Sequence, residues 1–192
     1  MIGDKDIVAL FEKQLARIGD GELRGKVVKT FVLACRRGNW ASVEALKKIP
    51  FTLLTDHLGV GFVEHTIAVT EGAAALGRAQ AEAYSRLPYA IDFDRLYAGG
   101  LLHDVGKLLE IEPDGLGGYR KSLPGKFARH PVSGAILAAE CGLPGDVINI
   151  IVCHAKEGEG RPQVVEAVLI HQADFATFDP LVMKQKGTLI ET

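Results

Sequence analysis

Apolar residues recur at intervals of three and four positions through most of the chain, and this is the spacing of one face of an α-helix. In the N-terminal part, the pattern predicts helices over about residues 7–18, 22–37 and 40–49. Asn39 is a suitable N-cap for the third helix, and Pro50 follows its expected end. The first quarter of the chain is therefore predicted to form amphipathic helices.

The rest of the chain continues the helical pattern with one interruption. Residues 60–84 are rich in alanine and glycine, which predicts a central helix that its neighbours can approach closely. Residues 112–126 hold two prolines and four glycines and predict an irregular loop. Further helices are predicted over about residues 92–104, 127–141, 146–154 and 164–178. Because no alternating strand pattern of useful length occurs, we expect an all-α fold, a single-domain helical bundle over residues 1–192.

Composition and charge narrow the classes of function. The net charge of −2 gives no basic field over the whole molecule, so we expect no stable nucleic-acid partner. Three cysteines without paired spacing fit reduced thiols better than a disulfide framework. The first residues are acidic where a secretion signal would be basic, and no apolar run approaches the ~20 residues that cross a bilayer. We therefore expect a cytoplasmic protein without membrane association.

The chemistry of the chain centres on His103-Asp104, an adjacent pair near the end of a predicted helix. Neighbouring residues on a helix point about 100° apart, so this pair can hold a metal ion only if other helices supply further ligands. Four more residues of ligand type lie in or at the ends of other predicted helices: His65, His130, His154 and Asp174. A single histidine is more often a core or surface residue than a ligand, but the whole series predicts a metal site.

Imidazole and carboxylate ligands without a thiolate are typical of a catalytic rather than a structural metal site. We expect one or two divalent ions per chain, with iron or manganese preferred over magnesium, cobalt, nickel or zinc. Asp104 can bridge two ions through its two oxygens.

Lys107 follows Asp104 by three residues and His103 by four, which would place it on the same helical face. A cation beside a metal cluster is favourable where a substrate anion also binds, and lysine binds phosphate as a point charge. The alternative is a solvated charge one turn below the site. We interpret Asp104 and Lys107 as the catalytic residues, and we expect Gly106 to let another helix pack closely.

His65, His103-Asp104 and Asp174 resemble, in this order, the defining motif of the HD-domain metal-dependent phosphohydrolase superfamily. The resemblance implies an HD-type metal-binding core over about residues 57–180, with the helices of residues 1–50 packed on it. It also implies hydrolysis of a phosphomonoester or phosphodiester by a metal-activated water. We expect the substrate to be a small or nucleotide-like phosphoester.

The downstream histidines resemble the two-metal branch of this superfamily. His130 matches its extra histidine and His154 matches the first of its paired histidines, whereas Ala155 replaces the second. The segments that lead to His154 and Asp174 are similar to the catalytic domain of the endoribonuclease RNase Y. No part of the sequence resembles the membrane anchor, coiled coil or KH domain of that enzyme, so we expect no RNA cleavage.

The run from His103 to His130 is also similar to HD-GYP cyclic-dinucleotide phosphodiesterases. Residues 158–162, Gly-Glu-Gly-Arg-Pro, stand where those enzymes have the Gly-Tyr-Pro signature. Gly61 stands where some of them supply a glutamate to a third metal ion. We therefore expect no three-metal centre.

Two histidines lie outside the motif. His171 precedes Asp174 by three residues, so we expect it to orient that carboxylate through a hydrogen bond. We expect a structural role for His57.

Two other functions remain open for the same ligands. The HD fold also hosts mixed-valence di-iron oxygenases, which use the same residue types to activate oxygen. The third hypothesis is a non-catalytic metal-binding signalling module, although a degenerate module would be expected to lose some ligand positions.

Overall fold

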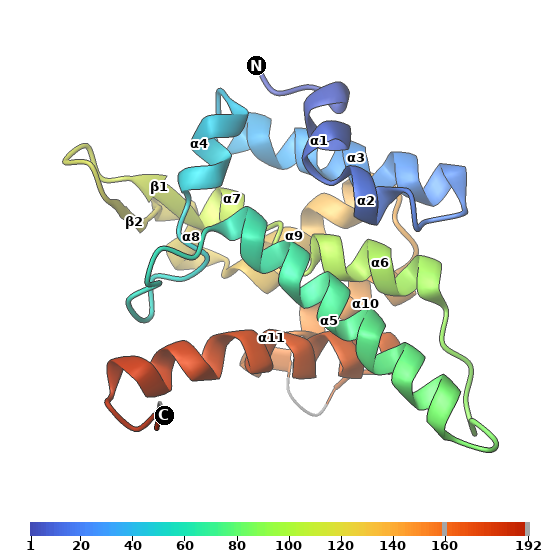
Figure 1. The fold of residues 1–192 in the computed structure, drawn as a ribbon. Coiled ribbons are helices and arrows are strands. Elements are labelled where there is room, and N and C mark those ends of the chain that lie inside the picture. The colour runs from blue at the N-terminus through green and yellow to red at the C-terminus, as the bar shows by residue number, and fades with distance from the viewer. Residues whose placement is uncertain (159–160, 191–192) are drawn as a thin grey trace.

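Helices make up most of the chain in the computed structural model, which describes residues 1–158 and 161–190 (Figure 1). The elements, in chain order, are α1 (Asp4–Leu10), α2 (Glu12–Leu15), α3 (Gly21–Arg37), α4 (Val43–Lys48), α5 (Phe62–Ala83), α6 (Phe93–Leu102), α7 (Lys107–Glu110), β1 (Ile111–Pro113), β2 (Tyr119–Lys121), α8 (Leu123–Phe127), α9 (His130–Glu140), α10 (Gly145–Cys153), η1 (Lys156–Gly158) and α11 (Val165–Gln185). The prediction of an all-α fold is confirmed, with one short two-stranded sheet in the described part of the chain.

Helices α5 and α6 lie in the middle of the molecule, with α1–α4 on one side and α11 on the other (Figure 1). Two glycines let α6 approach its neighbours. A Cβ atom at Gly99 would lie 2.6 Å from Ile150 Cδ1 of α10, and one at Gly100 would lie 2.9 Å from Thr70 Oγ1 of α5. Both distances are too short for a larger residue, so glycine lets three helices meet just before the turn that follows α6.

The N-terminal helices bury apolar side chains and also contact α7. The rings of Phe11 and Phe31 stack with centroids 4.9 Å apart. The Trp40 indole N–H donates to the Leu108 carbonyl oxygen over 2.7 Å, in a buried position. A Cβ atom at Gly38 would lie 1.9 Å from the same oxygen. These contacts fix the N-terminal helices against the short helix that begins with Lys107.

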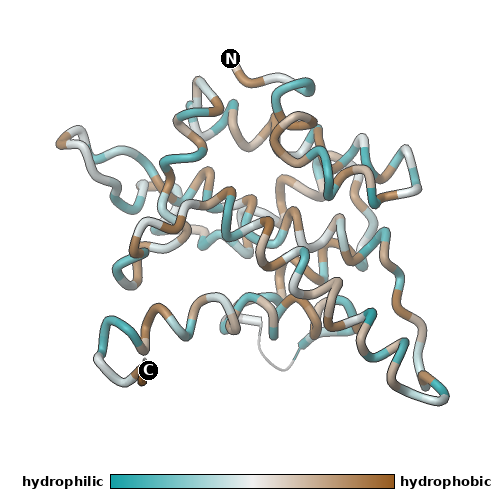
Figure 2. The backbone as a smooth tube through the Cα atoms, viewed as in Figure 1, coloured by the Kyte–Doolittle hydropathy of each residue, from teal (hydrophilic) through white to brown (hydrophobic). Residues whose placement is uncertain are grey.

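One cluster of buried apolar residues extends from Ile2 to Ala173 of α11. Hydrophobic and hydrophilic positions alternate along the helices, as the brown and teal segments of Figure 2 show. Burial of such apolar faces stabilises helices that would be marginal alone in water. None of the described helices is both long enough and apolar enough to cross a membrane.

A buried carboxylate joins the beginnings of α6 and α11. Glu166 Oε1 accepts the Asp92 backbone N–H over 2.7 Å, and Glu166 Oε2 pairs with Arg95 over 3.2 Å. Arg95 also pairs with Asp146 of α10 over 2.8 Å. Because a buried charge is tolerated only when it is paired, this network fixes three helices relative to one another.

Residues 112–126 do not form the irregular loop that the sequence predicted. Strands β1 and β2 pair antiparallel, with Ile111 opposite Lys121, and α8 follows them. Gly115 and Gly117 turn the chain between the strands at φ values of +80° and +95°, which favour glycine. Strands of three residues are too short to show an alternating pattern, so the sequence analysis missed this hairpin.

Several predicted helix boundaries also differ from the structure. The first predicted helix is divided into α1 and α2, and the helix predicted from residue 127 begins at His130. Ser42 caps α4 by accepting the Ala45 N–H, whereas Asn39, the predicted cap, adopts a φ of 59°. Gly142 follows α9 at a φ of +72°, as expected of a left-handed C-terminal residue.

Candidate metal centre

The six side chains predicted as ligands come from five parts of the chain. His103 and Asp104 lie in the turn between α6 and α7, not within a helix as predicted, because α6 ends at Leu102. The other four are positioned by helices, with His65 in α5, His130 at the start of α9, His154 directly after α10 and Asp174 in α11. All but Asp174 are buried, and the Asp174 side chain is 17% exposed.

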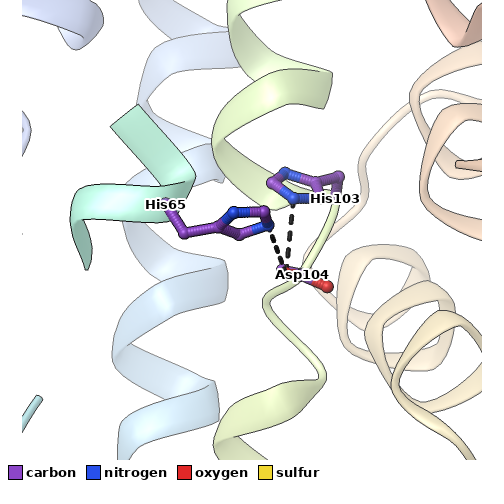
Figure 3. Close-up of side chains that lie close together, drawn as sticks. All are labelled: His65, His103 and Asp104. Atoms are coloured by element: carbon purple, nitrogen blue, oxygen red, sulfur yellow. Dashed lines mark ion pairs between the residues drawn. The ribbon is translucent and has the colours of Figure 1, made fainter. Parts of the chain in front are cut away.

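Asp104 lies at the centre of this group, and its two carboxylate oxygens face different histidines. Oδ2 is 3.3 Å from His65 Nε2 and 3.4 Å from His103 Nε2 (Figure 3). Oδ1 is 3.3 Å from His130 Nε2 and 3.5 Å from His154 Nε2. Within each set, the potential ligand atoms lie within 4.8 Å of one another. The structure therefore contains two groups that could each hold a metal ion, and Asp104 is common to both.

The Nδ1 atoms of the histidines set their orientation. His103 Nδ1 lies 2.6 Å from the Gly100 carbonyl oxygen, and His154 Nδ1 lies 2.8 Å from the Ile151 carbonyl oxygen. A carbonyl oxygen only accepts, so each Nδ1 carries the proton and each Nε2 presents a lone pair towards Asp104. Both Nε2 atoms are buried without a hydrogen-bond partner. Such orphaned acceptors, together with carboxylate oxygens, fit a divalent cation.

Asp174 lies beside His65 of the first group. Asp174 Oδ1 is 3.1 Å from His65 Nε2. The Thr177 hydroxyl donates to the Asp174 carbonyl oxygen over 2.8 Å and lies 3.3 Å from His65 Nδ1, so it is positioned to accept the Nδ1 proton. The sequence analysis missed Thr177, although its spacing of three residues from Asp174 on a helix is a usable signal.

Glu110 is a second residue near the site that the sequence analysis missed. Its Oε2 accepts hydrogen bonds from His130 Nδ1 over 2.8 Å and from the His130 backbone N–H over 2.7 Å. Its Oε1 pairs with Lys121 over 2.9 Å and with Arg129 over 3.0 Å. Burial alone would raise the pKa of Glu110, but His130 and Lys121 hold the pKa at about 2. No sequence spacing relates Glu110 to His130, because hairpin and α8 residues separate them.

The two carboxylates of the candidate centre are ionised at neutral pH. Burial alone would raise the pKa of Asp104, but the Lys107 ammonium and the His103 imidazole hold the pKa well below its usual range. Burial opposes ionisation of Asp174 as well, and the adjacent His65 imidazole lowers the pKa to about 2. The centre therefore offers anionic oxygen ligands beside imidazole nitrogens.

Lys107 lies beside Asp104 across a turn, and not along one helical face as predicted. Lys107 Nζ lies 2.5 Å from Asp104 Oδ2 and 2.5 Å from the Phe51 carbonyl oxygen. The Lys107 side chain is 13% exposed, and it lies on the wall of a cavity. It is therefore held in place by two acceptors and is not a freely solvated charge.

Two glycines close to the centre have packing roles. A Cβ atom at Gly106 would lie 2.1 Å from the His130 carbonyl oxygen, which confirms the expectation that another helix packs closely here. A Cβ atom at Gly61 would lie 2.8 Å from the Lys47 carbonyl oxygen. A glutamate at position 61 would therefore collide with the backbone of the last turn of α4. Of residues 158–162, predicted to replace the Gly-Tyr-Pro signature, residues 159 and 160 lie outside the described chain.

The two histidines outside the motif behave differently from each other. His171 Nδ1 lies 2.6 Å from the His154 carbonyl oxygen, so His171 supports the backbone of His154. The prediction that His171 orients the Asp174 carboxylate through a hydrogen bond is wrong, because His171 Nδ1 faces the His154 carbonyl oxygen instead. His57 Nδ1 lies 3.1 Å from the Val60 carbonyl oxygen within its own loop, which agrees with the structural role expected of His57.

A cavity of about 820 Å³ opens onto the candidate centre at Lys107, His130 and Asp174. Ala155, which follows His154, also lines it. The volume lies in the range of small-molecule sites. The buried polar groups therefore have an accessible space in front of them.

Comparison with known proteins identifies similar sequences. A model of the HD domain family matches residues 62–176, more than half of the chain. Ribonuclease Y of Pseudothermotoga lettingae is 32% identical over 116 residues, which cover 60% of this chain and 18% of that protein. Ribonuclease Y of Acidothermus cellulolyticus is 37% identical over 84 residues, which cover 44% of this chain and 14% of that protein. The chain thus spans less than a fifth of the length of these ribonucleases.

A relative of another kind matches over more of the chain. Dihydroneopterin 2′,3′-cyclic phosphate phosphodiesterase of Methanocaldococcus jannaschii is 27% identical over 175 residues, which cover 85% of this chain and 66% of that protein. No solved structure matches the chain significantly.

Replacement of Asp104 should remove bound metal, because Asp104 belongs to both groups of potential ligands. We expect Asp104→Ala, purified without chelator, to carry less than a tenth of the wild-type metal content in elemental analysis, while its helical circular dichroism stays native. Glu82→Ala, which removes an exposed carboxylate from α5, is the control and should keep the full metal content. Wild-type metal content in Asp104→Ala would contradict the assignment.

Replacement of Glu110 should weaken one of two metal-binding steps. Glu110→Gln removes the charge that orients His130, so we expect a roughly 10–100-fold loss of affinity for the second Mn²⁺ ion in calorimetric titration. The affinity for the first ion should stay within about twofold. Glu112→Gln is the matched control, because Glu112 pairs with Arg120 on the same hairpin and touches no histidine of the centre. Equal losses in both variants would argue against a role of Glu110 in positioning His130.

Proposed function

The chain belongs to the HD domain family, as its motif predicted, and from this premise we propose that it is a metal-dependent phosphohydrolase acting on a small phosphoester. HD domains bind divalent metal ions, and this chain has two groups of histidine and aspartate residues suited to them. We also propose that residues 57–180 form the metal-binding core and that the helices of residues 1–50 complete one domain with it. The contact between Trp40 and Leu108 supports this arrangement.

We propose that one ion is held by His65, His103, Asp104 and Asp174, and a second by Asp104, His130 and His154. Iron and manganese suit this mixed nitrogen and oxygen set best. Bound divalent ions would supply Lewis-acid activation of water and of phosphoryl oxygens near neutral pH. The observation that carries the proposal is the position of Asp104, whose two oxygens face separate histidine pairs beside a cavity.

The protein residues have separate tasks in this reaction. The hydrogen bonds at Nδ1 of His103 and His154 orient both rings so that their Nε2 atoms face Asp104, where they could bind an ion. The Lys107 ammonium has three donors, of which Asp104 and the Phe51 carbonyl use two. The third can bind a phosphoryl oxygen that enters from the cavity. Lys107 would then offset negative charge on the equatorial oxygens in the transition state.

A cyclic or nucleotide-like phosphodiester is the substrate class that we propose first. One relative, matched over 85% of this chain, is named as a dihydroneopterin 2′,3′-cyclic phosphate phosphodiesterase. Aromatic side chains of Phe51, Phe175 and Phe178 line the cavity and suit a planar ring. The ribonucleases match over less than a fifth of their own length, and we propose no RNA cleavage for this chain.

A substrate panel tests the proposed function. Mn²⁺-loaded and Fe²⁺-loaded protein should hydrolyse adenosine 2′,3′-cyclic phosphate, and EDTA treatment or Asp104→Ala should abolish the activity. A structured RNA should stay intact under the same conditions. If protein with a full complement of metal cleaves no phosphomonoester or phosphodiester, the hydrolase proposal falls. Oxygen uptake with an organic substrate would then favour the oxygenase hypothesis, in which the same ligands hold iron.

Lys107 should affect turnover more than metal binding. We expect Lys107→Ala to lower kcat by roughly 10²–10³-fold, since one charged donor to the transition state is lost. Metal content, measured by elemental analysis, should not change. Lys107→Arg should restore part of the activity, because a planar guanidinium keeps the charge but not the shape of an ammonium. Wild-type rates in Lys107→Ala would exclude a catalytic role.

A further inference from the structure

The cavity has two chemically different walls, and each can be placed relative to the candidate centre. The aromatic wall consists of Phe51, Phe175 and Phe178. The ring of Phe51 stacks on His65 with centroids 4.5 Å apart, and the ring of Phe178 meets Phe51 edge-on at 6.1 Å. The aromatic wall therefore lies on the His65 side of Asp104.

The basic wall consists of Arg120, Lys121, Arg129 and Lys156, which come from β2, the residue before α9, and η1. A chain of contacts connects it to the centre. Lys121 Nζ is 2.9 Å from Glu110 Oε1, and Glu110 Oε2 is 2.8 Å from His130 Nδ1. His130 Nε2 is in turn 3.3 Å from Asp104 Oδ1. Lys121, together with Arg129 directly before His130, therefore places the basic wall on the His130 side of Asp104, whereas the aromatic wall lies on the His65 side.

The charge on the cavity differs from that of the chain as a whole. The chain has a formal net charge of −2, yet five basic and two acidic side chains line the cavity. Lys121 is 35% exposed, Arg120 is 65% exposed, and Lys156 is exposed on η1. Divalent ions at the centre would add further positive charge. Lys107 already serves a phosphoryl group at the centre, so the basic wall suits a different anionic group.

We propose that the basic wall binds a second phosphoryl group of the substrate, one that is not cleaved, while the aromatic wall packs against the substrate ring. The substrate class is then a nucleotide-like phosphoester with two separate phosphoryl groups. This proposal rests on the proposed function, because the first phosphoryl group lies at the metal centre. It goes further in fixing the orientation, with the ring towards His65 and the second phosphoryl group towards His130.

The affinities for two nucleotides that differ by one phosphate test the proposal independently of the rate of hydrolysis. In calorimetric titration, adenosine 3′,5′-bisphosphate should bind Mn²⁺-loaded protein roughly tenfold more tightly than adenosine 3′-monophosphate. The gain comes from charge-assisted hydrogen bonds between the second phosphate and the basic wall. Lys156→Gln and Lys121→Gln should each reduce this ratio, and the double variant should bring it close to one. Lys121→Gln also removes the ion pair with Glu110 and could disturb the position of His130. Lys156 is exposed on η1, so Lys156→Gln tests the basic wall without this side effect.

Lys126→Gln is the matched control, because Lys126 is an exposed lysine of α8 that does not line the cavity. Its affinity ratio should equal that of wild type. Equal binding of the two nucleotides by wild type overturns the proposal, and so does a full bisphosphate advantage in the double variant. The proposed function fails on a different result, the absence of phosphoester hydrolysis by metal-loaded protein, so the two failures are distinguishable.

Discussion

The ionised carboxylate of Asp104, buried among four imidazoles, is the constraint on which the arrangement of the site depends. A buried charge is stable only when it is compensated, and neutral imidazoles bring no charge. Lys107 supplies one positive charge over 2.5 Å, but Asp174 adds another negative charge beside His65. The remaining imbalance, together with inward-facing Nε2 lone pairs, suits divalent cations. A buried Asp104 carboxylate without compensation would destabilise the fold, whereas a bound cation would stabilise it.

The two groups that share Asp104 are not equivalent. Each group has three potential ligands, but the Asp174 carboxylate lies beside the first, whereas Ala155, which lines the cavity, lies beside the second. Catalytic metal sites usually keep an open position, whereas sites closed by protein ligands are structural. The second group therefore offers fewer protein groups to hold an ion. Glu110 compensates in part, because its hydrogen bond with Nδ1 fixes the orientation of the His130 ring. Glu110 also pairs with Lys121 and so connects the second group to the basic wall of the cavity.

The sequence predicted the helical fold and the convergence of six ligand-type residues, because helical periodicity is local and the order of the motif encodes which helices meet. It did not predict features that depend on tertiary geometry. Glu110 contacts His130 through packing that no sequence spacing reveals, and the hairpin strands were too short to detect. Thr177, which contacts His65, was missed although its spacing of three residues from Asp174 was a usable signal. His171 was assigned the wrong partner, since its Nδ1 faces the His154 backbone. The ligand roles and the domain boundaries stay predictions.

The N-terminal helices also bear on the chemistry, although none of the predicted ligands belongs to them. The end of α4 lies so close to the start of α5 that a Cβ atom at Gly61 would be 2.8 Å from the Lys47 carbonyl oxygen. Pro50 pairs with Gly61 in an isolated bridge, and the next residue, Phe51, supplies the carbonyl that holds Lys107 and the ring that stacks on His65. One backbone crossing thus leaves no room for a third carboxylate at position 61. The same crossing positions a cation and an aromatic face beside the centre.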